Sequence, residues 1–232
     1  MNKIKAIIFD YDGVIAESVN VKTEAFAELY KPYGIDVVQK VIKHHEANGG
    51  VSRFEKFKIY HKNFLREDID QLEIDVLANK FSNLVLQKVI DSPYVKGVYD
   101  FISSNYQNYD FHISTGTPSG EIETILKQKS LRKFFNEVYG SPEKKYSHVK
   151  KILKKYSYNK NEVVFIGDAL SDRDAARSNE INFIGRYTTV DAIKKERYLI
   201  ENFFELEKIL NQIQESIWKK IVINIANILL IT

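Results

Sequence analysis

Short apolar runs alternate with helical patterns along the chain. Four runs are apolar at most positions: residues 6–9, 111–113, 163–166 and 182–184. Such runs are typical of strands that are buried on both faces of a parallel sheet. Between them lie three segments with apolar side chains at helical spacing: residues 119–128, 147–156 and 171–179. The alternation predicts an α/β fold with a doubly wound, mostly parallel sheet.

The region between the first two predicted strands has a different pattern. Four stretches in it have helical spacing, and no strand pattern interrupts them: residues 23–30, 37–48, 52–65 and 69–90. We therefore expect an all-helical domain inserted into the α/β domain. The predicted boundaries are 1–16 and 93–205 for the α/β core, 17–92 for the insert, and 206–232 for a helical tail.

Composition excludes several classes of protein. The chain has no cysteine, which excludes thiol catalysis, disulfides and cysteine-based zinc sites. Its formal net charge of +3 is too small for a general nucleic-acid binder, so we expect no nucleic-acid partner. The apolar run at 6–9 is too short for a signal peptide, and no stretch is long and apolar enough to span a membrane. We expect a cytoplasmic protein.

The last segment, residues 217–232, is unusually apolar. Ile217, Ile221, Ile225 and Ile228 share one face of a predicted helix. The segment is too short to cross a bilayer, so packing on the core or on a second chain is expected. A homodimer through this tail is one prediction, and a membrane-surface helix is the alternative.

Acidic residues follow the first predicted strand. Asp10 and Asp12 come directly after it, and Gly13 lets the backbone turn away from them. In open parallel sheets ligands bind at the carboxyl ends of the strands. Two carboxylates this close repel each other unless a divalent cation neutralises them, and hard oxygen ligands suit Mg²⁺. A calcium loop is the alternative, but the further acids that it needs are missing.

Polar motifs follow the later strands as well. Thr115 and Gly116 end the second strand beside a helix N-terminus, which suits phosphate binding. Lys144 and Lys145 precede the next helix, where a lysine neutralises a phosphate or a charged transition state. Asp168 and Asp172 follow the predicted strand at 163–166. The parallel sheet predicts that all these groups meet at one edge.

In this order the motifs resemble those of the haloacid dehalogenase superfamily of phosphohydrolases. The matching segments are Phe-Asp-Tyr-Asp-Gly-Val at 9–14, Ile-Ser-Thr-Gly at 113–116, Gly-Ser-Pro-Glu-Lys-Lys at 140–145 and Ile-Gly-Asp-Ala-Leu-Ser-Asp at 166–172. The helical insert is similar to the family's type 1 cap, and the resemblance implies the family's Rossmann-like core. One departure is Glu17-Ser18, where the family often has Asp-Ser.

The resemblance implies roles for the acidic residues. Asp10 would attack phosphorus and form an aspartyl-phosphate, which divides one difficult step into two. Asp12 would protonate the leaving oxygen, then activate water, and bind Mg²⁺ through its backbone carbonyl. Asp168 would complete the metal site with Asp10, and Asp172 would support it through water or a hydrogen bond.

The resemblance also implies the groups that hold the phosphate. The phosphate-binding residues would be Tyr11, Thr115 and Gly116, and Lys145 would shield the charge between phosphate and nucleophile. Ser114 is the alternative to Thr115, and Lys144 is the alternative to Lys145. We prefer Thr115 because glycine follows it directly, and Lys145 because it fits the family's Gly-Ser-Pro-x-x-Lys spacing.

The expected activity is Mg²⁺-dependent hydrolysis of a small phosphate monoester, similar to phosphoglycolate or a sugar phosphate. Asp12 favours phosphate esters because the family's dehalogenases lack an acid at this position. Segment 49–57 resembles the specificity loop of phosphoglycolate-phosphatase-like members, so Ser52 and Arg53, with His45 nearby, are candidate substrate-binding residues. The alternatives are a phosphomutase similar to β-phosphoglucomutase and a non-catalytic binding module.

Overall fold

The computed structural model of the chain describes residues 3–187 and 190–229, with side chains described for residues 3–187, 190–219 and 223. Its sheet has six strands in the order β3-β2-β1-β4-β5-β6, and every neighbouring pair is parallel. The strands are β1 (Ala6–Phe9), β2 (Asp110–Pro118), β3 (Glu137–Ser141), β4 (Val163–Gly167), β5 (Asn182–Arg186) and β6 (Leu199–Ile200). The predicted doubly wound α/β fold is confirmed.

The sequence analysis did not predict two of the strands, β3 and β6, which lie at the two edges of the sheet. β3 is half-buried over its first three residues, and β6 is two residues long. An edge strand has only one neighbour and is less deeply buried, so it lacks the continuous apolar run that marks the central strands.

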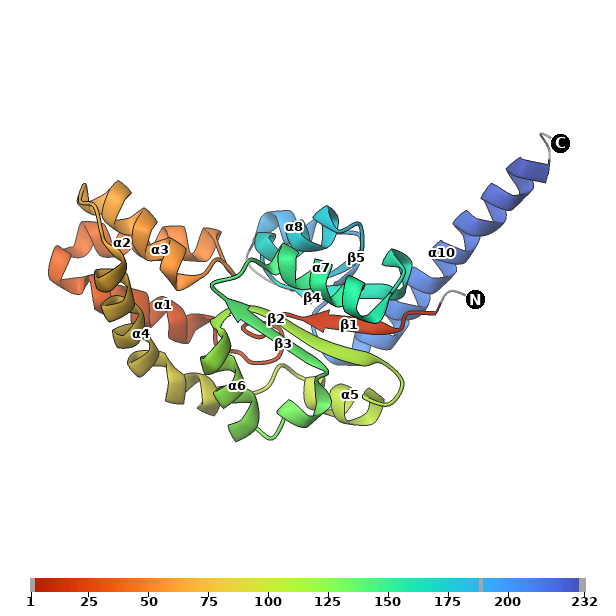
Figure 1. Cartoon of the computed structure of the whole chain (residues 1–232), viewed down its shortest axis with the longest axis horizontal. Coiled ribbons are helices and arrows are strands. Elements are labelled where there is room, and N and C mark those ends of the chain that lie inside the picture. The colour runs from red at the N-terminus through yellow and green to blue at the C-terminus, as the bar shows by residue number, and fades with distance from the viewer. Residues whose placement is uncertain (1–2, 188–189, 230–232) are drawn as a thin grey trace.

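Helices cover both faces of the sheet (Figure 1). One face packs against α5 (Val98–Asn105), α6 (Ser119–Gln128) and α10 (Leu206–Leu229), and the other against α7 (Lys145–Tyr156), α8 (Leu170–Ser178) and α9 (Asp191–Lys194). Side chains of β1 alternate between the two cores: Ile7 and Phe9 belong to the first, Ala6 and Ile8 to the second. Both cores consist of buried apolar side chains, which is why β1 is apolar throughout.

Four helices form a separate cap at one end of the sheet (Figure 1). They are α1 (Val19–Tyr30), α2 (Ile35–Ala47), α3 (Arg53–Tyr60) and α4 (Gln71–Asp91). Aromatic side chains hold them together: the Phe26 ring lies 5.9 Å from the Phe57 ring and 4.4 Å from the Phe81 ring. The domain boundaries themselves stay a prediction. Short helical turns complete the chain at Lys31–Tyr33, His61–Leu65, Arg132–Phe134, Lys160–Glu162 and Phe203–Glu205.

The long last helix, α10, packs on the core with its first half. Leu206, Leu210, Ile213 and Ile217 are buried there, and the helix then extends away from the core (Figure 1). Across the part of the chain that the structure describes, no helix is long and apolar enough to span a membrane. The predicted dimer through the tail depends on side chains 220–222 and 224–232, which lie outside the described residues.

The direction of the strands decides where the site lies. β1 runs toward the cap helices, so the carboxyl ends of the parallel strands face the cap (Figure 1). The residues that follow β1 and β4 therefore lie between the core and the cap, where ligands bind in open α/β sheets.

Candidate active site

Three carboxylates meet at the carboxyl ends of β1 and β4. Asp10, Asp168 and Asp172 each place one oxygen atom within 4.8 Å of the other two. They come from three separate segments: Asp10 follows β1, Asp168 follows β4, and Asp172 lies in the first turn of α8. The sheet topology thus joins residues that are far apart in the sequence, as predicted.

The electrostatics of this cluster favour a bound cation. Burial, followed by the charges of Asp10 and Asp172, raises the pKa of Asp168 well above its ordinary value. Burial also raises the pKa of Asp172 to about 7, against the opposing charge of Lys145. Buried carboxylates that repel each other are stabilised by a hard divalent cation, and this all-oxygen donor set fits Mg²⁺.

Lys145 lies beside the cluster and bridges two of its members. Its Nζ is 2.8 Å from Asp10 Oδ2 and 2.5 Å from Asp172 Oδ1. Burial alone would lower the pKa of Lys145, but Asp10 and Asp172 raise it above its ordinary value, so the ammonium stays charged. The neighbouring Lys144 is 69% exposed and pairs with Glu55 of the cap. The structure thus places Lys145, rather than Lys144, against Asp10.

Asp12 has its own set of partners. Its carboxylate accepts hydrogen bonds from Ser18 Oγ at 2.6 Å, from Thr117 Oγ1 at 3.2 Å, and from the ammonium of Lys22. Burial would raise the pKa of Asp12, but Lys22, with Ser18 and Thr117, outweighs it and holds the pKa below its ordinary value. Lys22 belongs to the cap helix α1 and was not predicted, because spacing along the chain does not reveal this contact.

The side chains of β2 separate the two hydroxyl candidates. Ser114 Oγ lies 3.0 Å from Nδ1 of His148 in α7, which covers the second face of the sheet. Thr115 instead lines a cavity together with Gly116 and Asp10. Alternation along the strand explains the difference, because neighbouring side chains point to opposite faces.

Tyr11 lies next to the cavity without lining it. Its side chain is fully buried, and burial raises the pKa of its phenol. Its backbone N–H donates to Asp10 Oδ1 at 2.7 Å. If Tyr11 binds phosphate as predicted, the contact therefore comes from this backbone group rather than from the phenol.

The cavity lies between core and cap and has a volume of about 210 Å³. The core contributes the wall with Asp10, Asp12, Thr115, Gly116 and Asp168. The cap contributes apolar rings from Phe26 and Phe81 and three cationic side chains, from Lys22, Arg53 and Lys56. The core side of the cavity is thus acidic. The cap side has these three cationic groups and one acidic residue, Glu46.

The Gly49–Gly50 loop of the cap presses against the core. Ser171 Oγ donates to the Gly49 carbonyl at 3.1 Å. Gly50 has a φ of +73°, and a Cβ added to it would lie 2.9 Å from Lys145 Nζ. The positive φ favours glycine here, and a larger residue would also displace the end of the Lys145 side chain.

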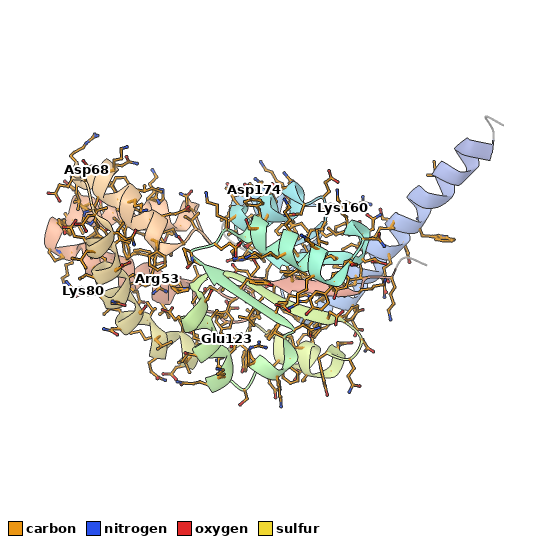
Figure 2. The ribbon with its side chains drawn as sticks, viewed as in Figure 1. Arg53, Asp68, Lys80, Glu123, Lys160 and Asp174 are labelled. Atoms are coloured by element: carbon orange, nitrogen blue, oxygen red, sulfur yellow. The ribbon has the colours of Figure 1, made fainter. Side chains whose placement is uncertain are left out.

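The predicted cap residues have partners of their own. The Arg53 guanidinium donates to both carboxylate oxygens of Glu121, at 2.7 and 3.0 Å, and to Ser82 Oγ at 2.7 Å. Figure 2 labels Arg53, which lies nearer to the core than the cap residues Asp68 and Lys80 do. Arg53 lines the cavity, but its charge is already paired within the protein.

Ser52 and His45 occupy different positions. Ser52 caps α3 by accepting from the Glu55 N–H at 3.3 Å, and it lines a neighbouring cavity rather than the one that contains Asp10. His45 lines the cavity of Asp10, and its Nδ1 lies 2.7 Å from Lys56 Nζ. Lys56 was not predicted. Its helical position alone did not distinguish it from the other lysines of the cap.

An acidic cluster at the carboxyl ends of a parallel sheet, covered by a helical cap, defines a class of α/β enzymes with an oxygen-rich metal site. The chain belongs to the haloacid dehalogenase-like hydrolases, whose family model matches residues 7–186. This confirms the family predicted from the motifs.

Named relatives cover nearly the whole chain. A 2-hydroxy-3-keto-5-methylthiopentenyl-1-phosphate phosphatase of Microcystis aeruginosa is 24% identical over 225 residues, 89% of this chain and 97% of its own. A phosphorylated carbohydrates phosphatase of Thermotoga maritima is 26% identical over 228 residues, 91% of this chain and 99% of its own. Among solved structures, a β-phosphoglucomutase of Clostridium difficile shares the fold with a TM-score of 0.72 and 18% identity, covering 90% of this chain and 98% of its own.

Proposed function

We propose that the protein hydrolyses a small phosphate monoester, with Mg²⁺, through an aspartyl-phosphate on Asp10. The observation that carries this proposal is the contact of Lys145 with Asp10, beside the half-buried carboxylate of Asp168 and the buried carboxylate of Asp172. The two relatives named from their sequences are phosphatases, which supports the same class of reaction.

The metal site would be formed by Asp10 and Asp168, with Asp172 and the backbone carbonyl of Asp12 in support. Both carboxylate oxygens of Asp172 already accept hydrogen bonds, one from Lys145 and the other from the Ala169 N–H at 3.1 Å. We therefore expect Asp172 to support the metal site through water or a hydrogen bond. When bound, Mg²⁺ supplies positive charge that reduces the repulsion between an anionic nucleophile and an anionic phosphate.

In the first step a carboxylate oxygen of Asp10 attacks phosphorus, and the ester P–O bond breaks. The ammonium of Lys145 holds the Asp10 carboxylate in place and shields its charge, since it lies 2.8 Å from Oδ2. Thr115 and the backbone N–H of Gly116 line the same cavity and would hold the phosphate oxygens.

Asp12 would transfer the protons. It donates a proton to the leaving alcohol oxygen and then, as a carboxylate, removes one from the water that hydrolyses the aspartyl-phosphate. Lys22, Ser18 and Thr117 fix the orientation of this carboxylate. Because Lys22 favours the anionic form, it assists the second step more than the first.

The decisive experiment replaces the nucleophile. Asp10→Asn should reduce hydrolysis of p-nitrophenyl phosphate in Mg²⁺ by about 10³-fold or more, as removal of a nucleophile does in other enzymes. Asp100→Asn, an exposed residue of α5, serves as the control and should retain full activity. Undiminished turnover by Asp10→Asn would eliminate the proposed nucleophile.

The same residues would serve a phosphomutase, which returns the phosphoryl group to a sugar. Release of inorganic phosphate from a monoester, without any bisphosphate added, distinguishes the phosphatase from the mutase. We expect stoichiometric phosphate release.

A further inference from the structure

Lys56 is a buried cation that faces the cavity from the cap. It lies in α3, its residue is 1% exposed, and it lines the cavity that contains Asp10. Its Nζ lies 2.7 Å from Nδ1 of His45 and 5.5 Å from the centre of the Phe26 ring. Among the residues that the structure describes, no carboxylate forms an ion pair with it. A buried ammonium in such surroundings is costly unless an anion accompanies it.

The other cations around the cavity all have carboxylate partners. Arg53 pairs with Glu121, Lys22 with Asp12, and Lys145 with Asp10 and Asp172. Each of those charges is therefore compensated within the protein, and Lys56 differs from them.

Most of the charges around Lys56 disfavour its charged form. Burial, followed by the charges of Lys22 and Lys145, lowers the pKa of Lys56 to about 7, and the charge of Asp12 opposes them. Lys22 lines the same cavity as Lys56, and Lys145 lines the neighbouring one. An additional anion placed there would favour the ammonium form of Lys56.

His45 holds the ammonium in position. Charged lysine can only donate hydrogen bonds, so with Lys56 in its ammonium form Nδ1 of His45 accepts and the ring proton lies on Nε2. Burial, followed by the charge of Lys56, lowers the pKa of His45 to about 2, so the imidazole is neutral. The ring also packs on Phe26, with centroids 4.8 Å apart. His45 therefore orients Lys56 without neutralising it.

We propose that Lys56 binds a second anionic group of the substrate, a carboxylate or a second phosphate, at the cap side of the cavity. This inference rests on the proposed function, in which the ester phosphate occupies the core side near Asp10. The Lys56 ammonium has two N–H bonds beyond the one given to His45, and both suit an anionic oxygen. The substrate class is thus a small phosphate ester with two anionic ends rather than a neutral sugar or alkyl phosphate.

The test compares matched substrates that differ in one anionic group. In the carboxylate arm, 2-phosphoglycolate is compared with its primary amide. In the phosphate arm, propane-1,3-diol bisphosphate is compared with the monophosphate. In one of the pairs, the wild type should favour the ester with an anionic group at each end by about 10- to 100-fold in kcat/KM. A hydrogen-bonded charge pair typically contributes this much.

Two variants assign this preference to Lys56. Lys56→Met removes the charge and keeps the length, and it should reduce the preference at least tenfold, through KM. Lys58→Met removes an exposed lysine of the same helix and should keep the preference. Thermal unfolding of both variants checks that they fold, and Lys56→Gln replaces Lys56→Met if the latter does not.

The inference is overturned if the wild type treats both members of each pair alike, or if Lys56→Met keeps the preference. Failure of the proposed function is separate: a wild type that hydrolyses no ester, p-nitrophenyl phosphate included, disproves the phosphatase. In that case, calorimetric titration of the wild type with the same four esters tests the role of Lys56 by binding alone. Equal affinity for the two esters of each pair would overturn that role.

Discussion

The Gly50 carbonyl oxygen lies 2.6 Å from the position that a Cβ on Gly116 would occupy. Gly50 belongs to the cap loop and Gly116 to the carboxyl-terminal part of β2, so backbones of the cap and of the core meet at the cavity. A side chain at Gly116 would have to move backbone atoms of the loop, which is far harder than moving the end of a side chain.

This contact predicts the effect of Gly116→Ala. The added methyl group should keep the cap loop from closing and should lower kcat/KM for p-nitrophenyl phosphate by about 10- to 100-fold, since small displacements in a site have effects of this size. Gly120→Ala is the matched control, because nothing lies within 4 Å of the added Cβ. Equal activity of the two variants would mean that the loop does not close on Gly116 during turnover.

A second prediction concerns Lys22 and Asp12. Lys22→Met leaves the buried Asp12 carboxylate without its cation and should reduce the free energy of unfolding by roughly 3–5 kcal/mol at pH 7. The ion pair holds the pKa of Asp12 below its ordinary value, so its contribution is present above that value, near pH 4, and is lost as the pH falls further. Urea unfolding in metal-free buffer at several pH values measures this.

The control for Lys22 is Lys31→Met, which removes a 75% exposed lysine paired with Glu28. An exposed pair contributes little, so this variant should unfold like the wild type. A loss of stability in Lys22→Met that stays constant from pH 7 down to pH 3 would contradict the assignment to Asp12.

Replacing Lys56 should change the stability in the opposite direction to replacing Lys22. Burial depresses its pKa from 10.5 to about 7, so the folded state binds fewer protons than the unfolded state between these values. Stability of the wild type should therefore rise with pH in that interval. Lys56→Met should be more stable than the wild type by roughly 1–3 kcal/mol at pH 6, and the difference should shrink as the pH approaches 10. A wild type that is the more stable protein at pH 6 would show that Lys56 has a counter-charge.

The acidic cluster predicts how the metal affects stability. Mg²⁺ should raise the melting temperature of the wild type, because a ligand that binds only the folded state stabilises it. Asp168→Asn should lose most of this increase. In metal-free buffer the same variant should melt higher than the wild type, since it removes a carboxylate whose pKa is raised by burial and by Asp10 and Asp172.

Differential scanning fluorimetry with and without Mg²⁺ measures both effects for Asp168→Asn. Asp174→Asn is the control, because Asp174 is exposed on α8 and lies outside the carboxylate cluster. A magnesium response that is the same in Asp168→Asn and in the wild type would place the metal elsewhere.

The core side of the site could be predicted from the sequence because strand ends are local features. Asp10 and Asp168 each follow an apolar run directly, and a parallel sheet brings such ends together whatever the loops do. The choice of Lys145 over Lys144 came from the family's spacing, and the geometry agrees with it.

The cap side could not be predicted in the same way. Lys22 and Lys56 lie on helices whose rotation and packing depend on the whole cap, so helical spacing alone did not show which lysines face the cavity. Arg53 was predicted as a substrate ligand, and no sequence pattern indicates its pairing with Glu121, which lies 68 residues away. That role for Arg53 stays a prediction.

The Arg53–Glu121 pair joins a cap helix to a core helix, with Ser82 of the cap donating to the same carboxylate at 2.7 Å. Opening the cap away from the core would separate these groups and expose both charges to water, which would cost free energy. In the proposed phosphatase the pair would therefore oppose opening of the cap, and its strength would influence how fast product leaves.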